Sequence, residues 1–205
     1  MSRVRLARVV RELPRRAHDL SRKAVHDSQK WRILEAITEV TAKMGYGDAS
    51  VADVIAVAGV SRKTFYEHFS DKEDCFLTAY GVLSDRLVKV LVGVGAGHPD
   101  GAKRRRAQVT AFLKALSLEP AAARVFIVDV LGAGPRALRK RERVNASFAE
   151  AILGGAIDDP VGRAAIVGGV NNVVSAALLE GRARELLGLA SPLSEFVERA
   201  LGRAR

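Results

Sequence analysis

The sequence predicts an all-α protein of about nine helices. Apolar residues recur at intervals of three and four along nearly the whole chain, which is the spacing of one face of a helix. Glycine and proline interrupt this pattern, and no segment shows the strict alternation that is typical of a half-buried strand. Hydrophobic residues make up 48% of the 205 residues but aromatic residues only 5%, so the core must consist mainly of aliphatic side chains.

Residues 50–73, SVADVIAVAGVSRKTFYEHFSDKE, predict two short helices joined by a tight turn. Ser50 can cap the first helix, with Asp53 in the position of a capping-box partner. Gly59 permits the backbone conformation that often follows a helix end, and Ser61 can cap a second helix over about residues 62–69. That helix buries two phenylalanines and leaves a polar, basic surface, which fits the major groove of DNA. The stretch is therefore predicted to be a helix-turn-helix.

Two longer helices are expected to flank this unit. One begins at Asp27 or Ser28, ends at Gly45 and supports the helix-turn-helix; the other covers about residues 71–92, with Ser70 and Glu73 as its capping pair. The loop of residues 93–101, GVGAGHPDG, is the clearest break in the chain and a candidate domain boundary. We expect a basic N-terminal arm over residues 1–26, a helix-turn-helix DNA-binding domain over 27–76, and a helical effector-binding and dimerisation domain over 77–205.

The charge distribution separates these parts. The formal net charge is +10, which favours a polyanionic partner. Residues 1–26 hold eight basic residues against two acidic ones, residues 27–100 eight against eleven, and residues 101–205 seventeen against ten. The predicted helix-turn-helix is thus not the most basic segment, and total charge alone would not locate it.

Cysteine and hydropathy patterns bound the location and the chemistry. The single cysteine, Cys75, excludes an internal disulfide and a cysteine-based zinc site, which fits a reducing cytoplasm. No uninterrupted apolar run approaches the ~18 residues of a membrane span, and the charged N-terminus lacks the apolar segment of a secretory signal. We expect a cytoplasmic protein without a cofactor or a metal site.

Residues 1–26 leave three interpretations open. Leu6, Val9, Val10 and Leu13 form an apolar stripe among arginines until Pro14 interrupts it. The segment could be a basic arm that contacts the DNA backbone or minor groove, a membrane-surface or targeting helix, or a solvated tail.

Fixed residue types at fixed spacing across three helices carry a resemblance to a known family. The matching segments are ILEAITEV at residues 33–40, GYGDASVADV at 45–54 and AGVSRKTFYEHFSDKEDCF at 58–76. They resemble the DNA-binding domain of TetR-family (tetracycline-repressor-like) transcriptional regulators, over about a quarter of the chain. The resemblance implies a bacterial homodimeric repressor that binds a palindromic operator and is released from it by a small-molecule effector.

The DNA-binding residues are predicted from the exposed faces of the helix-turn-helix. Arginine and lysine can reach guanine, and threonine can contact a phosphate or a thymine methyl; the family position of Tyr66 often contacts a phosphate. Lys72 and Ser50 lie at helix N-termini, which attract phosphate. His68 is equally compatible with a surface histidine that flanks a buried phenylalanine. The predicted set is Ser50, Arg62, Lys63, Thr64, Tyr66, His68 and Lys72.

The last two helices are the predicted dimer interface. Their apolar stripes could instead pack within one chain, but in the TetR family these helices form a four-helix interface between two copies. A two-fold dimer spaces two recognition helices along the DNA by about one helical turn, ~34–36 Å, or more. The predicted interface residues are Ile166, Val170, Val173, Val174, Ala177, Leu178, Phe196, Val197, Ala200 and Leu201.

The family also implies an effector pocket between the connecting helix and the dimer interface. Candidate lining residues are Phe112, Phe126, Asp129, Phe148 and Asn172, although each is explained more simply as plain core or surface. Asp129 interrupts an apolar run and, if buried, would need a partner such as Arg124 or a ligand group. The basic clusters at residues 103–106 and 136–143 could bind an anionic effector such as an acyl-coenzyme A, or form solvated helix faces.

Three other functions compete with a ligand-responsive regulator. An enzyme is disfavoured because the four histidines are scattered, no HExxH or GxSxG motif occurs, and Cys75 lies in an apolar stretch. An architectural DNA-binding protein would bind without sequence selectivity, and a membrane-surface protein would bind vesicles through the N-terminal stripe.

Overall fold

A computed structural model gives the fold, and it describes residues 22–203. Within that range the chain forms nine α-helices and no strand, which confirms the predicted all-α class. The helices are α1 (Arg22–Met44), α2 (Val51–Ala58), α3 (Arg62–His68), α4 (Lys72–Ala96), α5 (Gly101–Leu118), α6 (Pro120–Ile127), α7 (Pro135–Leu153), α8 (Pro160–Leu179) and α9 (Ala190–Arg203). Three short 3-10 helices join them: η1 (Asp129–Gly132), η2 (Gly154–Ala156) and η3 (Ala183–Leu189).

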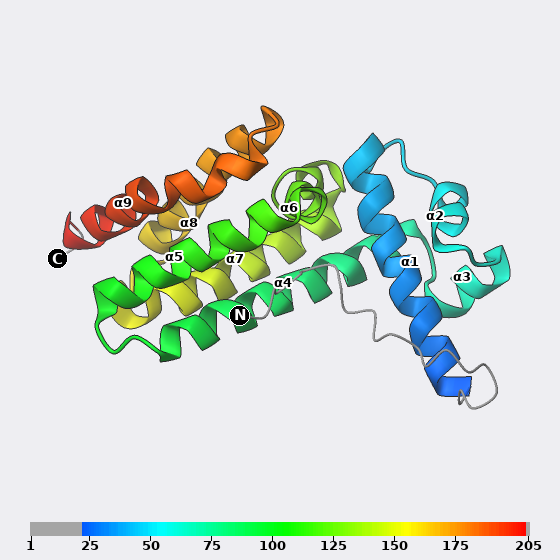
Figure 1. The fold of residues 1–205 in the computed structure, drawn as a ribbon, viewed down its shortest axis with the longest axis horizontal. Helices are drawn as coiled ribbons and strands as arrows, with labels where there is room; N and C mark the ends of the chain where they lie inside the picture. The colour runs from blue at the N-terminus through cyan, green and yellow to red at the C-terminus, as the bar shows by residue number, and fades with distance from the viewer. Residues whose placement is uncertain (1–21, 204–205) are drawn as a thin grey trace.

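The helices form a small head and a longer body (Figure 1). Helices α1, α2 and α3 make the head, and α4 runs out of it along the full length of the body. Helices α5 and α7 lie beside α4, α6 lies at the junction with α1, and α8 and α9 pair along the outer side. One helix therefore belongs to both parts, as expected for the segment after the helix-turn-helix.

One buried core runs through both parts. It contains Ile33 and Ile37 of α1, Phe65 of α3, Leu87 and Leu91 of α4, and continues through α5, α6, α7 and α8 to Leu193 of α9. A second, smaller cluster lies between α7, α8 and α9. The predicted division between residues 76 and 77 stays a prediction, and it separates two core residues, Phe76 and Tyr80, of the same cluster.

Several predicted helix ends need correction. The chain is already helical at Arg22, so the first helix begins before Asp27; no glycine or proline interrupts the intervening residues. Residues 1–21, which include most of the predicted basic arm, lie outside the described range. Helix α4 continues to Ala96 because the glycines after residue 92 do not break it, and Asp100 caps α5 through the backbone N–H groups of Ala102 and Lys103.

Candidate DNA-binding head and effector cavity

Local hydrogen bonds build the first half of the helix-turn-helix. The Ser50 hydroxyl accepts from the backbone N–H of Asp53 at 3.2 Å, and the Asp53 carboxylate accepts from the backbone N–H of Ser50 at 3.0 Å. This is the predicted capping box. The hydrogen bonds from the Ser50 hydroxyl and then from its backbone hold the pKa of Asp53 below its ordinary value. Gly59 ends α2 with φ of +61°, a left-handed conformation that disfavours a side chain.

Helix α3 turns its apolar side inward and its basic side outward. Phe65 and Phe69 are buried and lie 5.8 Å apart between ring centroids. On the outer side Lys63 is 87% exposed and Tyr66 48% exposed, and the guanidinium of Arg62 lies 5.8 Å from the centroid of the Tyr66 ring. These three side chains form the surface that a DNA groove could admit.

Two other predicted DNA contacts have local partners in the head. Ser61 caps α3 by accepting from the backbone N–H of Thr64 at 3.0 Å, and the hydroxyls of the two residues lie 2.9 Å apart. Thr64 is half-buried beside this cap, and the Ser50 hydroxyl is engaged at the other cap. A phosphate contact by either hydroxyl would have to share these bonds.

His68 packs α3 against α1. Its ring lies 4.1 Å from that of His26, and neither of its nitrogens is accessible or hydrogen-bonded within the described part of the chain. Burial, together with the nearby His26 and Lys30, lowers the pKa of His68, so its neutral form is favoured. This geometry favours the alternative interpretation, a histidine that flanks the buried Phe69, over a base contact.

Lys72 connects α4 to the segment between α1 and α2. Its ammonium donates to the backbone carbonyls of Tyr46 at 2.8 Å and Ala49 at 2.7 Å. The same nitrogen lies 4.3 Å from the centroid of the Tyr46 ring. The predicted phosphate contact by Lys72 stays a prediction, but these three contacts give the side chain a structural role that the sequence pattern did not indicate.

The body contains a small, apolar cavity. It has a volume of about 30 Å³ and lies between α5, α6, α7, α8 and α9. Phe112, Phe126 and Phe148, all predicted, line it, and Phe148 packs edge-on against the other two at 5.6 and 5.7 Å. The remaining lining residues are Val109, Asn145, Ile152, Leu153, Ile166, Val167, Val170, Asn171 and Val197.

Two predicted pocket residues lie elsewhere. Asn172 is exposed on the outer face of α8, and the preceding residue, Asn171, is the one that lines the cavity and donates to Asn145 at 3.2 Å. A single residue step turns the side chain by about 100° around a helix, which is enough to move it to another face. Asp129 is buried in η1 outside the cavity and pairs with Arg124 at 3.5 Å. Burial raises the pKa of Asp129, although Arg124 opposes the shift.

Aromatic rings connect this cavity to the head. Tyr46 packs on Phe76 at 4.7 Å, Phe76 on Tyr80 at 6.5 Å, and Tyr80 stacks on Phe126 at 5.2 Å. Phe126 in turn contacts Phe148 of the cavity. Because every ring in this series is packed against the next, a displacement of Phe126 would have to be accommodated at the base of the head.

The predicted dimer interface needs a correction. Six of its ten residues are buried in the chain's own core and are not on a surface: Ile166, Val174, Ala177, Leu178, Val197 and Leu201. Val170 and Ala200 are half-buried, whereas Val173 and Phe196 are 40% and 37% exposed. The most apolar stripe of each helix packs inward, so a partner would meet the other face.

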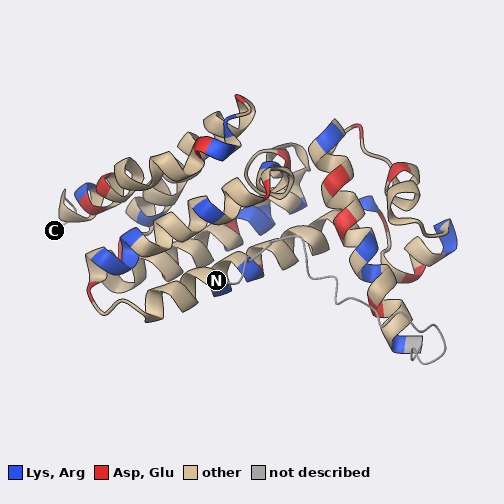
Figure 2. Ribbon diagram, in the orientation of Figure 1, with Lys and Arg blue, Asp and Glu red and all other residues tan. Residues whose placement is uncertain are grey.

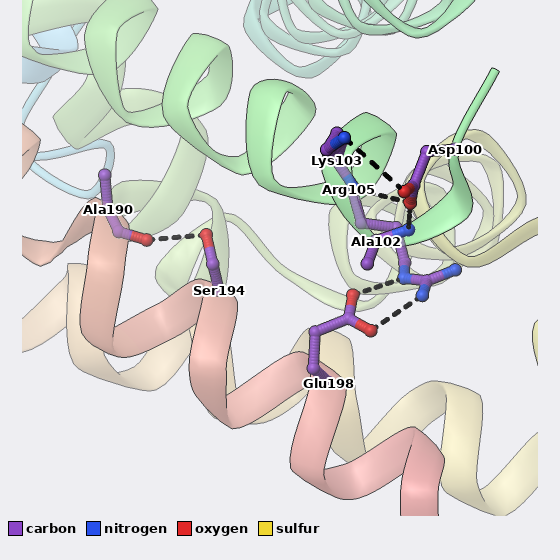
Figure 3. Close-up of polar contacts among 7 residues, drawn as sticks. All are labelled: Asp100, Ala102, Lys103, Arg105, Ala190, Ser194 and Glu198. Carbon is purple, nitrogen blue, oxygen red and sulfur yellow. Dashed lines mark hydrogen bonds and ion pairs between the residues drawn. The ribbon is translucent and has the colours of Figure 1, made fainter. Parts of the chain in front are cut away.

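A partly buried ion pair fixes α9 to the body. Arg105 of α5 donates to both carboxylate oxygens of Glu198 in α9, at 2.6 and 2.7 Å (Figure 3). The Arg105 side chain is 12% exposed, and its hydrogen bonds to Glu198 raise its pKa. Bidentate pairs of this kind add geometric specificity as well as energy, so the position of α9 relative to α5 is well defined.

Comparison with known proteins identifies the head. Residues 33–79 match the sequence profile of the family described as "Bacterial regulatory proteins, tetR family". Residues 33–79 therefore carry the DNA-binding segment of the TetR family. This confirms the resemblance that the motifs indicated, and the matched residues cover the second half of α1, the helix-turn-helix and the start of α4.

Relatives and solved structures extend the likeness beyond the TetR-family head. The HTH-type transcriptional activator FasR of Mycolicibacterium smegmatis is 33% identical over 86 residues, which span 42% of this chain and 39% of that protein. The fatty acid degradation regulator FadR of Bacillus halodurans has a TM-score of 0.75 at 22% identity, over 86% of this chain and 97% of that one. FadR of Bacillus subtilis, solved in complex with stearoyl-CoA, has a TM-score of 0.70 at 17% identity, over 80% and 95%. The described part of the chain therefore has the fold of these regulators.

Proposed function

We propose that this protein is a homodimeric DNA-binding transcriptional regulator that acts as a repressor and is released from a palindromic operator by an apolar effector. The outer face of α3 carries the proposal: Arg62, Lys63 and Tyr66 are exposed on a short helix that two buried phenylalanines fix to the head. Such a helix can place charged side chains against base edges and phosphates together. As a DNA regulator the protein would work in the cytoplasm.

The outer face of α8 supports the dimer. Exposed residues along it are mostly small or apolar: Val161, Ala165, Gly168, Asn172, Val173, Ala176 and Leu179. Helix α8 is long and apolar enough to cross a membrane by length and composition alone. Its inner face packs in the core, and a helix that is apolar on both sides is expected where it is covered on both sides. A second copy packed on α8, with Phe196 of α9 at the edge, would provide that cover.

The apolar cavity supports the effector. Its three phenylalanines and surrounding aliphatic residues would accept a hydrocarbon chain, as the stearoyl-CoA complex of the Bacillus subtilis neighbour also suggests. At about 30 Å³ the cavity holds no more than a water or two, so a longer ligand must separate the surrounding helices. A ligand that binds only the widened state shifts the protein toward it, and the packed rings from Phe126 to Tyr46 transmit the change to the head.

A DNA-binding titration tests the proposal. The upstream region of the protein's own gene, labelled with a fluorophore, should be bound with sequence selectivity, and binding should weaken as salt rises. The variant Arg62→Ala should weaken binding, while size-exclusion chromatography with light scattering should still report a dimer. Unselective binding of all DNA would instead support an architectural protein, and no binding would reject both functions.

The direction of regulation needs a separate measurement, because the relative FasR is named an activator. Transcription in vitro from the bound promoter should fall when the protein is added and recover when an effector is added. A rise on addition of the protein would make it an activator and would leave the DNA-binding proposal intact.

A further inference from the structure

A groove across the α5–α7 contact from the apolar cavity has features of a ligand site. It has a volume of about 770 Å³, opens to solvent and lies between α4, α5 and α7. Val88 and Val92 of α4 give it an apolar side, and Val92 is 55% exposed. Arg104 and Gln108 of α5 give it a cationic and a polar side.

Arg104 is the uncommitted cation of its cluster. Lys103 lies 3.9 Å from Asp100, Arg105 is bonded to Glu198, and Arg106 donates to Ser191 at 3.3 Å. Within the range that the structure describes, the guanidinium of Arg104 makes no ion pair and no hydrogen bond. It lines the groove half-buried, where a charge is screened less than at the open surface. Figure 2 shows that this basic end of α5 lies at the far end of the body from the head.

Gln108 lines the same groove and has an acceptor without a hydrogen-bond partner in the described chain. The residue is 2% exposed, and its amide nitrogen donates to the carbonyls of Leu91 at 3.0 Å and Ala151 at 2.8 Å. Its amide oxygen is buried and has no partner in the described chain. Buried acceptors without a partner are rare and call for an explanation, and a ligand that carries an N–H or O–H group would supply the missing donor.

Two glycines shape the groove around these side chains. A side chain at Gly95 would place its Cβ 2.5 Å from the amide nitrogen of Gln108, so only glycine leaves room for that amide. Gly154 has φ of +53° and lies where an added Cβ would be 3.8 Å from the Arg104 guanidinium. The acidic side chain in the groove, Glu150, is paired with Arg163 at 2.6 Å, which offsets its repulsion of an anion.

The groove and the apolar cavity meet at the contact between α5 and α7. Gln108 lines the groove and the next residue, Val109, lines the cavity; on α7 the groove has Ala151 and the cavity has Ile152. The hydrogen bond from Gln108 to Ala151 joins α5 to α7 at the place where the groove and the cavity adjoin. A ligand that parts this contact could occupy both.

We propose that the groove binds the anionic end of an amphipathic effector whose hydrocarbon chain enters the apolar cavity. A phosphate or carboxylate would pair with Arg104, and an amide or hydroxyl donor would satisfy Gln108. This inference rests on the proposed effector-responsive function and names the effector class: a long-chain acyl compound with a charged end. The unpaired guanidinium can pair with either anion, since arginine binds both well.

Isothermal titration calorimetry on the full chain tests the assignment with two probes, stearoyl-CoA and stearate, which carry phosphate with amides and carboxylate respectively. The wild-type protein should bind at least one of them, and Arg104→Gln should weaken that binding at least tenfold. Lys103→Gln, which removes a neighbouring charge outside the groove, should bind as wild type does. Arg104→Lys should restore part of the affinity.

The outcomes separate this inference from the proposed function. Arg104→Gln should fold normally, because the side chain has no partner to lose, and its operator affinity without a probe should equal that of the wild type. If the wild type binds neither probe, or if Arg104→Gln binds both as tightly as the wild type, the groove assignment is wrong even when operator binding is intact. If only stearoyl-CoA shows the loss, the charged end is the phosphate-bearing one; loss with stearate identifies a carboxylate.

Discussion

Substitution of Lys72 by alanine distinguishes a structural role from a DNA-binding one. The ammonium makes hydrogen bonds of 2.8 and 2.7 Å to two backbone carbonyls and lies 4.3 Å from the centroid of the Tyr46 ring. Hydrogen bonds that involve a charged group contribute about 1.5–3 kcal/mol each, and an exposed cation–π contact about 0.5–1 kcal/mol. Because the site is only half-buried and such contributions are not additive, we expect Lys72→Ala to lower the free energy of unfolding by about 2–4 kcal/mol.

The assay compares this variant with Lys63→Ala. The Lys63 side chain is 87% exposed and has one surface pair, with Glu67 at 3.9 Å, worth about 0.3–0.5 kcal/mol. Urea unfolding should therefore show a large loss for Lys72→Ala and almost none for Lys63→Ala. Operator titrations over a range of salt concentrations should show the reverse order. Lys63→Ala loses one phosphate contact, which reduces the slope of log affinity against log salt concentration by about one, whereas Lys72→Ala should leave this slope unchanged.

An unchanged urea midpoint for Lys72→Ala would refute the structural assignment. If the variant were as stable as the wild type and also lost one unit of salt slope, the ammonium would bind phosphate rather than the two carbonyls. Measurement of the slope well below the unfolding temperature keeps loss of folded protein from being counted as loss of affinity.

Three further substitutions test other parts of the structure. Arg105→Gln removes the bidentate bond to α9 and should cost roughly 1.5–3 kcal/mol in urea unfolding, with a matching rise in the dimer dissociation constant by sedimentation. Gly59→Ala places a side chain at φ of +61° and should cost about 1–2 kcal/mol; no loss would contradict the left-handed turn. Burial, with the nearby His26 and Lys30, lowers the pKa of His68 from its ordinary value of 6.5. The unfolded chain thus binds the proton more readily, and stability should fall as pH drops below 6.5. In His68→Leu that part of the pH dependence should disappear from urea midpoints measured between pH 7 and 5.

The sequence predicted the helix-turn-helix well because its signals are local. Ser50, Asp53, Gly59 and Ser61 act on backbone groups within a few residues, so their spacing alone determines the caps and the turn. The cap of α4 was the exception. Asp71 accepts from Asp74 there, and the acidic residues that follow Ser70 offer several equivalent capping pairs.

The sequence could not determine which helix face meets which neighbour. Helix α8 is apolar around most of its circumference, so periodicity did not reveal that Ile166 and Val174 face the chain's own core. The same ambiguity explains why Asn172 was predicted to line the effector pocket, whereas Asn171 lines the cavity. The groove residues gave no signal at all: Arg104 is one of four consecutive cations, and only the structure shows that its three neighbours have partners.

The charge of the head limits how tightly one copy can bind DNA. Residues 27–100 hold more acidic than basic residues. The exposed cations on α3 are Arg62 and Lys63, and the nearby Lys72 of α4 is hydrogen-bonded to backbone carbonyls. Electrostatic affinity grows with the number of phosphates that are neutralised. Two basic side chains can therefore contribute only a small part of the affinity for DNA. A two-fold dimer doubles this number and doubles the base contacts as well. The six arginines within residues 1–21 are the other source of positive charge near the head in sequence, so removal of this segment should reduce the salt slope by more than any substitution on α3.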